Sequence, residues 1–320
     1  MATTRRGFVQ SAGLGLAAHS LAAGAGTLPR RPLGRTGLEV SVLGLGGARI
    51  GALDDGQTAY RVIRRCHELG MNYFDTAAAG AYGLSQARYG KALQELRGEI
   101  VLATKTRHRT WVQAEIDMNQ SLQRLKTDHI DLYQVHNVMD DEDIDAIFAP
   151  RGLMEMIEKA KRDGKVRFVG VTGHADPGVM NRVLERYEFD TVLIPLSVTD
   201  GAAEAAKSFE KTTLPLARKQ GVGVIALTTV GLGRIMEKGI ATLGEAVSYI
   251  QALPVSTAIM GCDTVEQVEQ DVRALLAAKP LDKAGAERLR RRASRFELAR
   301  LEPWKQPANP VTGARPYTAC

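Results

Sequence analysis

The chain has 320 residues, of which 44% are apolar and 24% are charged, and its formal net charge is +6. This length suits one large α/β domain or two small ones, with ample apolar content for a core. The charge is mild. The densest basic run, residues 288–295, lacks aromatic residues for base stacking, so we expect a solvated helix face and no nucleic-acid partner. The cysteines Cys66, Cys262 and Cys320 have no metal-ligand spacing, so we expect no metal site and no disulfide framework.

The first 25 residues have the features of an export signal. The pair Arg5-Arg6 stands just before Phe8, and a short Gly/Ala-rich run with a small-x-small cleavage sequence follows. This pattern is typical of a twin-arginine signal, while the run is too short for a membrane-spanning helix. We therefore expect residues 1–25 to direct export, with a periplasmic location. If the arginine pair is accidental, the segment is a disordered tail and the protein is cytoplasmic.

From residue 31 onward, strand-like and helix-like segments alternate. A small hairpin leads into a first strand over residues 32–47. Further short apolar runs, typical of buried parallel strands, occupy 71–77, 99–105, 130–136, 165–173, 189–197, 222–229 and 256–261. Helical patterns follow the strands over 55–70, 85–96, 110–126, 152–164, 176–188, 202–221, 242–254 and 264–279. The sixth of these is expected to break before Pro215, and Asp176 is a good N-cap with Pro177 in the first turn.

Eight strands that are each followed by a helix predict a (β/α)8 TIM barrel over residues 26–302. The runner-up is a doubly wound open sheet. That fold predicts a GxGxxG turn at the start of the first helix, and none is placed there. The Pro-rich tail, residues 303–320, is expected to cover the barrel mouth, with Trp304 and Tyr317 stacking on a sugar or aromatic ring, or to be disordered.

Four polar residues stand where the predicted strands end, which is where functional groups gather in such a barrel. Asp75, Lys105 and His136 end the second, third and fourth strands, and Tyr82 lies in the loop after the second. They suit hydride transfer to a carbonyl. A tyrosine can donate the proton if a neighbouring ammonium lowers its pKa from about 10. An aspartate can hold that ammonium, and a histidine can donate a hydrogen bond to the substrate oxygen. In reverse, the phenolate is a base for alcohol oxidation.

The chain resembles the aldo-keto reductase family over about residues 31–278. The resemblance is carried by LGRTGLEVSVLGLGG, by NYFDTA with YG, Ser and GKAL after it, and by ATK, DLYQVH and IMGCDTVEQVEQD. It implies a (β/α)8 barrel with a nicotinamide cofactor, NADP(H) favoured narrowly over NAD(H). It implies catalytic roles for Asp75, Tyr82, Lys105 and His136, with Tyr82 as the general acid and base.

The resemblance also implies cofactor contacts after the fifth, seventh and eighth strands. The matching residues are Thr172, Gly173, Leu227, Gly231, Leu232, Gly233, Arg234, Gly261, Cys262, Thr264, Gln267 and Asp271. After strand seven, backbone N–H groups and the Arg234 guanidinium can bind a diphosphate. Thr264 with Gln267 fits a capping box on the last helix. Asp263 and Glu266 are poor neighbours for a 2′-phosphate, so the preference for NADP(H) is narrow.

Several positions depart from the family pattern. Tyr82 follows Asp75 by seven residues instead of five, and the extra residues lie in a Gly/Ala-rich loop that can bulge. Tyr89 is expected to pack within its helix. Gln86 replaces a Glu that is common in the family, and we expect no catalytic role for it. Leu227 stands where many members stack a tyrosine on the nicotinamide, so its contact would be apolar.

Together these observations predict an NAD(P)(H)-dependent oxidoreductase that interconverts a small-molecule carbonyl (aldehyde, ketone or sugar) and an alcohol. Free NADPH is not expected outside the cytoplasm. One alternative is therefore an exported enzyme whose tightly bound cofactor runs redox-neutral sugar chemistry, and another is a non-catalytic ligand-binding barrel. Loops 137–150 and 198–213 and the tail are expected to shape the pocket, with His174 a candidate substrate contact. The first loop is acidic. If its side chains face inward they disfavour anionic substrates, and if they are solvated they have no bearing on the charge of the substrate. Substrate identity and oligomeric state stay open.

Overall fold

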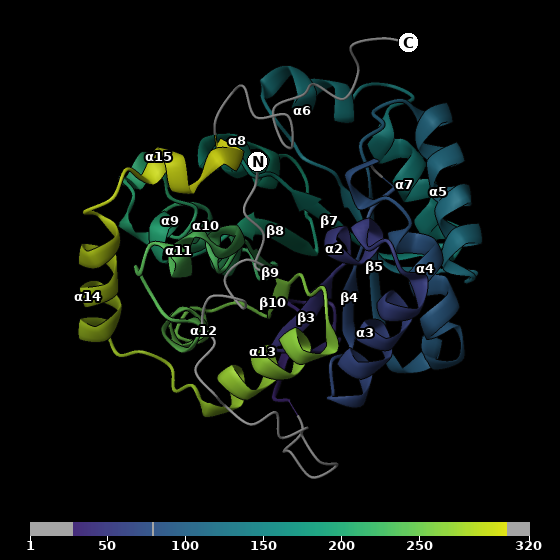
Figure 1. Cartoon of the computed structure of the whole chain (residues 1–320). Helices are drawn as coiled ribbons and strands as arrows, with labels where there is room; N and C mark the ends of the chain where they lie inside the picture. The colour runs from purple at the N-terminus through teal and green to yellow at the C-terminus, as the bar shows by residue number, and fades with distance from the viewer. Residues whose placement is uncertain (1–27, 79, 306–320) are drawn as a thin grey trace.

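The computed structural model describes residues 28–78 and 80–305, so the predicted export signal and Tyr317 lie outside the described part. An antiparallel hairpin of β1 (Arg30–Pro32) and β2 (Glu39–Ser41) precedes a closed barrel of parallel strands (Figure 1). The barrel strands are β3 (Leu43–Gly46), β4 (Tyr73–Asp75), β5 (Val101–Thr106), β6 (Ile130–Val135), β7 (Val166–Thr172), β8 (Thr191–Pro195), β9 (Gly223–Leu227) and β10 (Thr257–Met260). They pair in chain order, and β10 closes the barrel between β9 and β3.

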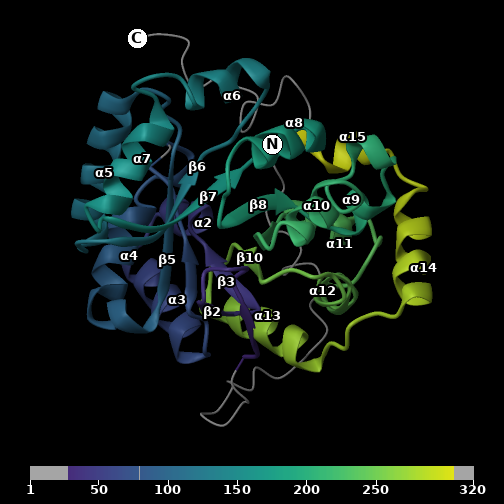
Figure 2. The same cartoon turned by 180° about the vertical axis from the view of Figure 1, so that it is seen from behind.

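A helix follows every barrel strand and packs on the outside, as Figures 1 and 2 show from opposite sides. These helices are α3 (Gly56–Glu68), α4 (Ser85–Leu93), α5 (Trp111–Leu125), α7 (Leu153–Arg162), α8 (Pro177–Arg186), α10 (Thr213–Lys219), α12 (Leu243–Gln251) and α13 (Val265–Ala277). The predicted (β/α)8 barrel is confirmed, and the closed sheet excludes the doubly wound alternative. No helix among the described residues is long and apolar enough to cross a membrane.

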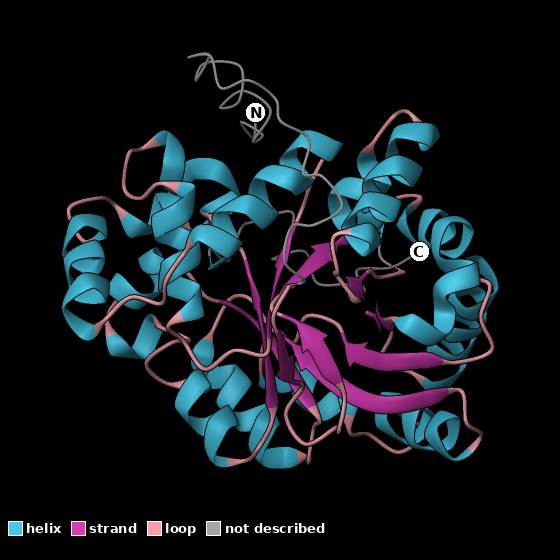
Figure 3. Ribbon diagram, turned by 90° about the horizontal axis from the view of Figure 1, so that it is seen from below, coloured by secondary structure: helices cyan, strands magenta, loops and turns pink. Residues whose placement is uncertain are grey.

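The barrel interior is a packed core that the hairpin closes at one end. Figure 3 shows the strands enclosed by helices. Inward-facing side chains such as Tyr73, Leu132 and Ile225 form one apolar cluster with Leu33 and Val40 of the hairpin. Two larger clusters fill the space between the strands and the helices. The hairpin therefore seals the end where strands begin, and the opposite end is left for the loops that follow the strands.

Two loop regions differ from the expectation. Residues 137–150 contain helix α6 (Asp141–Ile147), whose N-cap Asp140 accepts the Asp143 N–H at 2.9 Å. The sequence predicts a loop here, but the carboxylates of this acidic run lie in the first turn of α6, where they favour a helix N-terminus. Helical structure over 202–212 is not continuous, because α9 (Val198–Ala202) ends early and only a 3-10 turn, η3 (Ala205–Lys207), follows before α10. Pro215 lies in the first turn of α10, where proline is tolerated.

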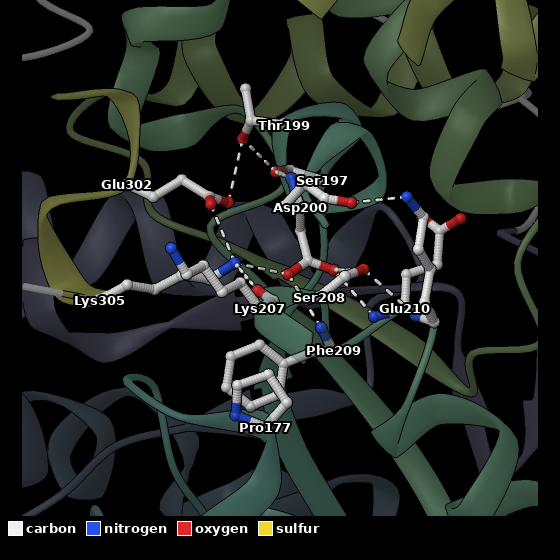
Figure 4. A network of polar contacts seen from close by, with 12 residues as sticks. Pro177, Ser197, Thr199, Asp200, Lys207, Ser208, Phe209, Glu210, Glu302 and Lys305 are labelled. Atoms are coloured by element: carbon white, nitrogen blue, oxygen red, sulfur yellow. Dashed lines mark hydrogen bonds and ion pairs between the residues drawn. The ribbon is translucent and has the colours of Figure 1, made fainter. Parts of the chain in front are cut away.

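The described chain ends in three short elements anchored near α9. They are α14 (Lys283–Ala293), which packs on α9, then α15 (Leu298–Leu301) and the 3-10 turn η5 (Pro303–Lys305). Figure 4 shows the polar network: Lys305 Nζ donates to Asp200 at 2.7 Å, and Thr199 donates to Glu302 at 3.2 Å. Trp304 is buried, so its ring offers no open face and the predicted stacking on substrate is not supported.

Candidate active site

The four residues predicted to do chemistry meet at the ends of neighbouring strands. Asp75 ends β4, Lys105 is the penultimate residue of β5 and His136 follows β6. Lys105 Nζ donates to Asp75 Oδ2 at 2.5 Å and to the Thr76 carbonyl at 2.8 Å. It also lies 3.5 Å from the Tyr82 hydroxyl, and the rings of Tyr82 and His136 have centroids 6.0 Å apart. One cation thus connects the carboxylate to the phenol.

The long spacing between Asp75 and Tyr82 is absorbed by a 3-10 turn, η1 (Gly80–Tyr82), that packs against the short helix α2 (Gly47–Ala52). Gly51 of α2 lies so close that a Cβ there would be 1.7 Å from the Tyr82 carbonyl oxygen. The Leu84 N–H donates to the Gly51 carbonyl at 3.4 Å. The sequence did not reveal α2, yet this helix is what holds the displaced tyrosine beside Lys105.

Asp75 and Lys105 form a fully buried ion pair, with exposed fractions of 0% and 1%. Burial raises the pKa of the Asp75 carboxyl, and the Lys105 charge opposes that shift. Burial lowers the pKa of Lys105 and is the largest single influence, but the charges and hydrogen bonds of Asp75 and Tyr82 together outweigh it, and the net shift is upward. The ammonium form of Lys105 is therefore favoured, which is the form that can act on the phenol of Tyr82.

The phenol of Tyr82 does not show the net lowering expected from its lysine neighbour. Burial raises the pKa of Tyr82 above its ordinary value, and Lys105 only opposes this rise. The physical reason is that a phenolate loses more hydration in this half-buried position than a cation 3.5 Å away restores. Tyr82 is thus held in its protonated, proton-donating form in the free protein.

His136 and His174 place two neutral imidazoles beside the tyrosine. Burial lowers the pKa of His136 well below its usual value, and the positive charges of Lys105 and Arg107 add to this. Burial also lowers the pKa of His174 to about 3. Their ring centroids lie 6.2 Å apart, and Thr172 Oγ1 lies 3.0 Å from His174 Nε2. A neutral imidazole still carries one N–H, so either ring can donate a hydrogen bond to a substrate oxygen.

Sequence reasoning missed one residue of the buried cluster, Gln134 on β6. Its Nε2 donates to Asp75 Oδ1 at 3.0 Å, opposite the oxygen that Lys105 contacts. The available signal was its register, because Gln134 and His136 stand two positions apart and share one face of the strand. Tyr89 packs inside the fold as expected and donates to the Leu45 carbonyl, and Gln86 is buried and donates to the hydroxyls of Thr104 and Ser121.

The loop after β9 forms a tight turn that leads into Arg234. Gly231, Leu232 and Gly233 make a 3-10 turn, η4, with φ angles of 57°, 57° and 94°. Two of its N–H groups are already used inside the turn, since Gly231 N–H donates to the Thr228 carbonyl at 2.7 Å and Gly233 N–H to the Val230 carbonyl at 2.9 Å. The expected set of N–H groups open to a diphosphate is therefore not formed. Leu232 is 50% exposed, and buried Nη1 of Arg234 has no hydrogen-bond partner among the described residues. A diphosphate would satisfy that guanidinium.

The residues after β10 are arranged differently from the expectation. The Cys262 thiol donates to Asp271 at 3.3 Å, and the side chains of Cys262, Asp271 and Gln267 are all buried. Gln267 closes its cap on the N–H of Asp263 at 2.7 Å, instead of on Thr264 as in the predicted capping box. Gln267 thus caps the start of α13, while Cys262 and Asp271 bond to each other inside the fold.

Other expected cofactor contacts lie at the rim. Thr172 is buried at the end of β7, and Gly173 follows where a Cβ would lie 2.1 Å from Met180 Sδ. Leu227 ends β9 and is partly buried. Arg49 of α2, which the sequence did not indicate, also lies at this rim. Its side chain packs over Gly261, and its guanidinium donates to the Asp263 carboxylate at 2.8 and 2.9 Å.

Comparison with known proteins gives a consistent result. A model of the aldo/keto reductase family matches residues 42–242. An uncharacterized oxidoreductase of Bacillus subtilis is 29% identical over 230 residues, which cover 68% of this chain and 70% of that protein. The L-galactose dehydrogenase of Arabidopsis thaliana is 30% identical over 224 residues, covering 65% and 67% of the two chains. The solved holo form of an aldo-keto reductase from Bacillus halodurans superposes with a TM-score of 0.70 and 27% identity, over 83% of this chain and 96% of that one.

Proposed function

Because this chain belongs to the aldo/keto reductase family and is an oxidoreductase of that family, we propose that it interconverts a carbonyl compound and an alcohol with Tyr82 as general acid and base. The observation that carries the proposal is the position of Lys105 Nζ, which contacts the Asp75 carboxylate at 2.5 Å and lies 3.5 Å from the Tyr82 hydroxyl. A tyrosine that served only for packing at the rim would not require a buried lysine–aspartate pair beside its hydroxyl.

Each residue of the group has a distinct role in this proposal. In reduction, the Tyr82 hydroxyl gives its proton to the substrate oxygen while the Lys105 ammonium stabilises the phenolate that remains. His136, as a neutral imidazole, donates a hydrogen bond that orients that oxygen and stabilises its developing negative charge. In oxidation the phenolate takes the proton back. Asp75 keeps Lys105 protonated and aimed throughout.

We propose a nicotinamide cofactor, NADP(H) favoured narrowly over NAD(H), which when bound supplies or accepts the hydride. The Arg234 guanidinium, whose Nη1 has no hydrogen-bond partner among the described residues, would bind its diphosphate beside the turn at 231–233, and the ends of β7 and β9 would flank the nicotinamide. Gly261 and Thr264 would face the rest of the nucleotide. The buried side chains of Cys262, Gln267 and Asp271 would not reach it without rearrangement. The bound pair of Arg49 and Asp263 adds no net charge there, which keeps the preference for a 2′-phosphate small.

We propose a small polyol or sugar-like molecule as the substrate, and the L-galactose dehydrogenase among the relatives supports this choice. The Arg5-Arg6 motif supports export to the periplasm through the twin-arginine route, which carries folded proteins. That motif also favours a second candidate, in which the cofactor is loaded before export, stays bound and is regenerated by the substrate itself. Such a cycle oxidises and then reduces the same sugar.

One experiment separates these candidates. The protein without residues 1–25 is purified and denatured, and the supernatant is assayed for NADP(H) and NAD(H). Near-stoichiometric nucleotide supports the retained-cofactor candidate and identifies the cofactor. No nucleotide supports an exchanging reductase, provided that titration then shows NADP(H) or NAD(H) binding. If neither nucleotide is retained or binds, the oxidoreductase proposal with this cofactor is wrong.

The role of Tyr82 is tested by Tyr82→Phe, with Tyr89→Phe as the matched control. The proposal expects Tyr82→Phe to lower kcat/KM by about 10²–10⁴-fold while cofactor binding is retained. Tyr89→Phe removes a buried hydroxyl that contacts only the fold, so it should leave kcat/KM within about twofold. Full activity of Tyr82→Phe would favour a different acid or a non-catalytic barrel.

A further inference from the structure

Gln134 occupies a position inside the barrel where an aliphatic side chain would be expected. It is 0% exposed and lies two residues after Leu132, which belongs to the apolar cluster of the barrel interior. Its Nε2 donates to Asp75 Oδ1 at 3.0 Å, while its Oε1 has no hydrogen-bond partner among the described residues. A buried acceptor without a partner costs folding free energy. The amide therefore has a reason to be there other than stability.

The amide of Gln134 donates the hydrogen bond to the second oxygen of the buried Asp75 carboxylate. Lys105 Nζ occupies Oδ2 at 2.5 Å and Gln134 occupies Oδ1. The reversed amide would place its oxygen against the carboxylate, so the donor orientation is the only favourable one. In a low-dielectric interior, a lysine and an aspartate in contact can exchange the proton and become neutral. A donor on the second oxygen stabilises the carboxylate and so keeps the proton on Lys105.

The shape of the interior holds the amide in this position. Gly170 on β7 faces it, and a Cβ there would lie 3.0 Å from Gln134 Cγ and 2.4 Å from Thr191 Oγ1. The space left by the glycine is thus filled by the two polar side chains. Thr191 is also fully buried, and its hydroxyl has no hydrogen-bond partner among the described residues. It shares the environment of Gln134 but has no hydrogen bond to Asp75 among the described residues, which makes it a matched control.

We propose that Gln134 is a positioning residue that fixes the Asp75 carboxylate, holds Lys105 in its ammonium form and thereby keeps Tyr82 competent to exchange its proton. This inference rests on the proposed function of Tyr82. The titratable and charged groups that face the cluster are Tyr73 and Asp75 on β4, Tyr82 after it, Tyr89 on α4, Lys105 and Arg107 at the end of β5, His136 after β6 and His174 after β7. Among these, Gln134 hydrogen-bonds only to Asp75 in the described structure.

The test compares Gln134→Met with Thr191→Val. Without the amide donor, Asp75 becomes more basic and draws the proton from Lys105, so Tyr82 loses part of the charge that favours its phenolate. The acid limb of the pH profile for alcohol oxidation should move upward by about 0.5–1 pH unit. At a pH below that limb kcat should fall by about three- to tenfold, with KM nearly unchanged because Gln134 touches no substrate. Thr191→Val should keep the wild-type profile.

A second readout does not depend on the substrate. Phenolate formation is followed by ultraviolet difference titration, with Tyr82→Phe as the blank that identifies the Tyr82 signal. Gln134→Met should move that titration in the same direction as the kinetic profile. Gly170→Ala keeps Gln134 but crowds both its Cγ, at 3.0 Å, and Thr191 Oγ1, at 2.4 Å. It should shift the titration the same way and serves if Gln134→Met does not fold, with Thr191→Val as the control for the disturbance of Thr191.

The outcomes distinguish the catalytic role of Tyr82 from the positioning role of Gln134. An active Tyr82→Phe overturns the proposed function itself. An inactive Tyr82→Phe with unchanged titrations in Gln134→Met and Gly170→Ala overturns only the role of Gln134. A shift of equal size in Thr191→Val also overturns it, because the effect would then belong to the interior packing in general.

Discussion

At the residue scale, the site depends on charges and imidazoles held away from water. Lys105 is 1% exposed and has three oxygen neighbours within 3.5 Å, on Asp75, Thr76 and Tyr82. A lysine so deeply buried is tolerated only because the carboxylate compensates its lost hydration. The same burial keeps His136 and His174 neutral, so the site offers hydrogen-bond donors without adding two further cations beside the phenol.

Lys105→Met should destabilise the fold as well as the chemistry. It leaves Asp75 buried without its cation, which costs about 3–5 kcal/mol. The pKa of Asp75, already raised by burial, then rises further. A carboxyl whose folded pKa exceeds its unfolded value of about 4 loses stability as the pH rises through that window. Urea denaturation at acid and neutral pH should therefore show a smaller defect in acid. Lys159→Met, at the exposed pair with Asp163, should cost less than about 1 kcal/mol at either pH.

His174 should make the protein less stable in acid. Its pKa is about 3 in the folded chain against about 6.5 when unfolded. The unfolded state therefore binds more protons below about pH 6.5, and stability falls as the pH decreases through that window. His174→Gln should reduce this loss by about 2 kcal/mol at pH 5, measured as the difference in unfolding free energy between pH 7 and pH 5. Parallel pH curves for variant and wild type would contradict the assignment.

At the element scale, short segments outside the eight βα units position the site and its surroundings. Helix α2 packs on η1 and returns Tyr82 across a loop longer than the family pattern. Helix α6 pairs its acidic residues with basic ones: Asp143 with Arg109 at 2.6 Å and Asp141 with Arg182 at 2.6 Å. The acidic loop therefore presents paired charges, so these two carboxylates give no reason to exclude anionic substrates. The segment from α14 to η5 is tied to α9 by Lys305.

Lys305→Met should loosen the C-terminal segment. The Asp200 carboxylate, 0% exposed, would lose its cation and keep only N–H and hydroxyl donors such as Phe209 N at 3.0 Å. The expected cost is about 2–4 kcal/mol of unfolding free energy, with faster amide hydrogen exchange in α15 and η5. Arg300→Met, which removes the exposed Arg300–Glu297 pair of α15, is the control and should change neither. Equal exchange in both variants would show that Lys305 is not the anchor.

At the scale of the whole molecule, the barrel separates stability from chemistry. The hairpin closes one end, where Gly34 approaches Gly223 so closely that a Cβ would lie 2.2 Å from its nitrogen. The proposed catalytic groups all lie at the other end, after β4, β5 and β6. A parallel barrel brings the carboxyl ends of all its strands to one rim, so residues distant in the chain share one site.

The export proposal is tested on the full chain. Changing Arg5→Lys together with Arg6→Lys should leave the protein in the cytoplasm in a host with the twin-arginine pathway, while the wild type reaches the periplasm. Cell fractionation with an immunoblot measures the distribution. The folded barrel should be unaffected, so activity or nucleotide binding per molecule serves as the control. Equal periplasmic fractions would contradict the signal interpretation.

The sequence alone determined the order of the elements and the identity of the main polar residues. Alternating apolar runs and helical patterns specify eight βα units, because a strand buried on both faces must be apolar and its covering helix amphipathic. The position of Asp75, Lys105 and His136 at strand ends then places them at one rim. Tyr82 was within reach of the same reasoning despite its unusual spacing.

Only the tertiary structure decided which side chains contact one another. The packing of α2 on η1, the amide of Gln134 on Asp75 and the inward turn of Gln267 and Asp271 depend on contacts between segments far apart in the chain. Local pattern carries no information on such contacts, since the same glutamine or aspartate fits a rim, a helix cap or a buried cluster. The direction of the Tyr82 pKa shift was also decided only by the tertiary structure. Burial by the surrounding fold raises this pKa more than the neighbouring Lys105 lowers it.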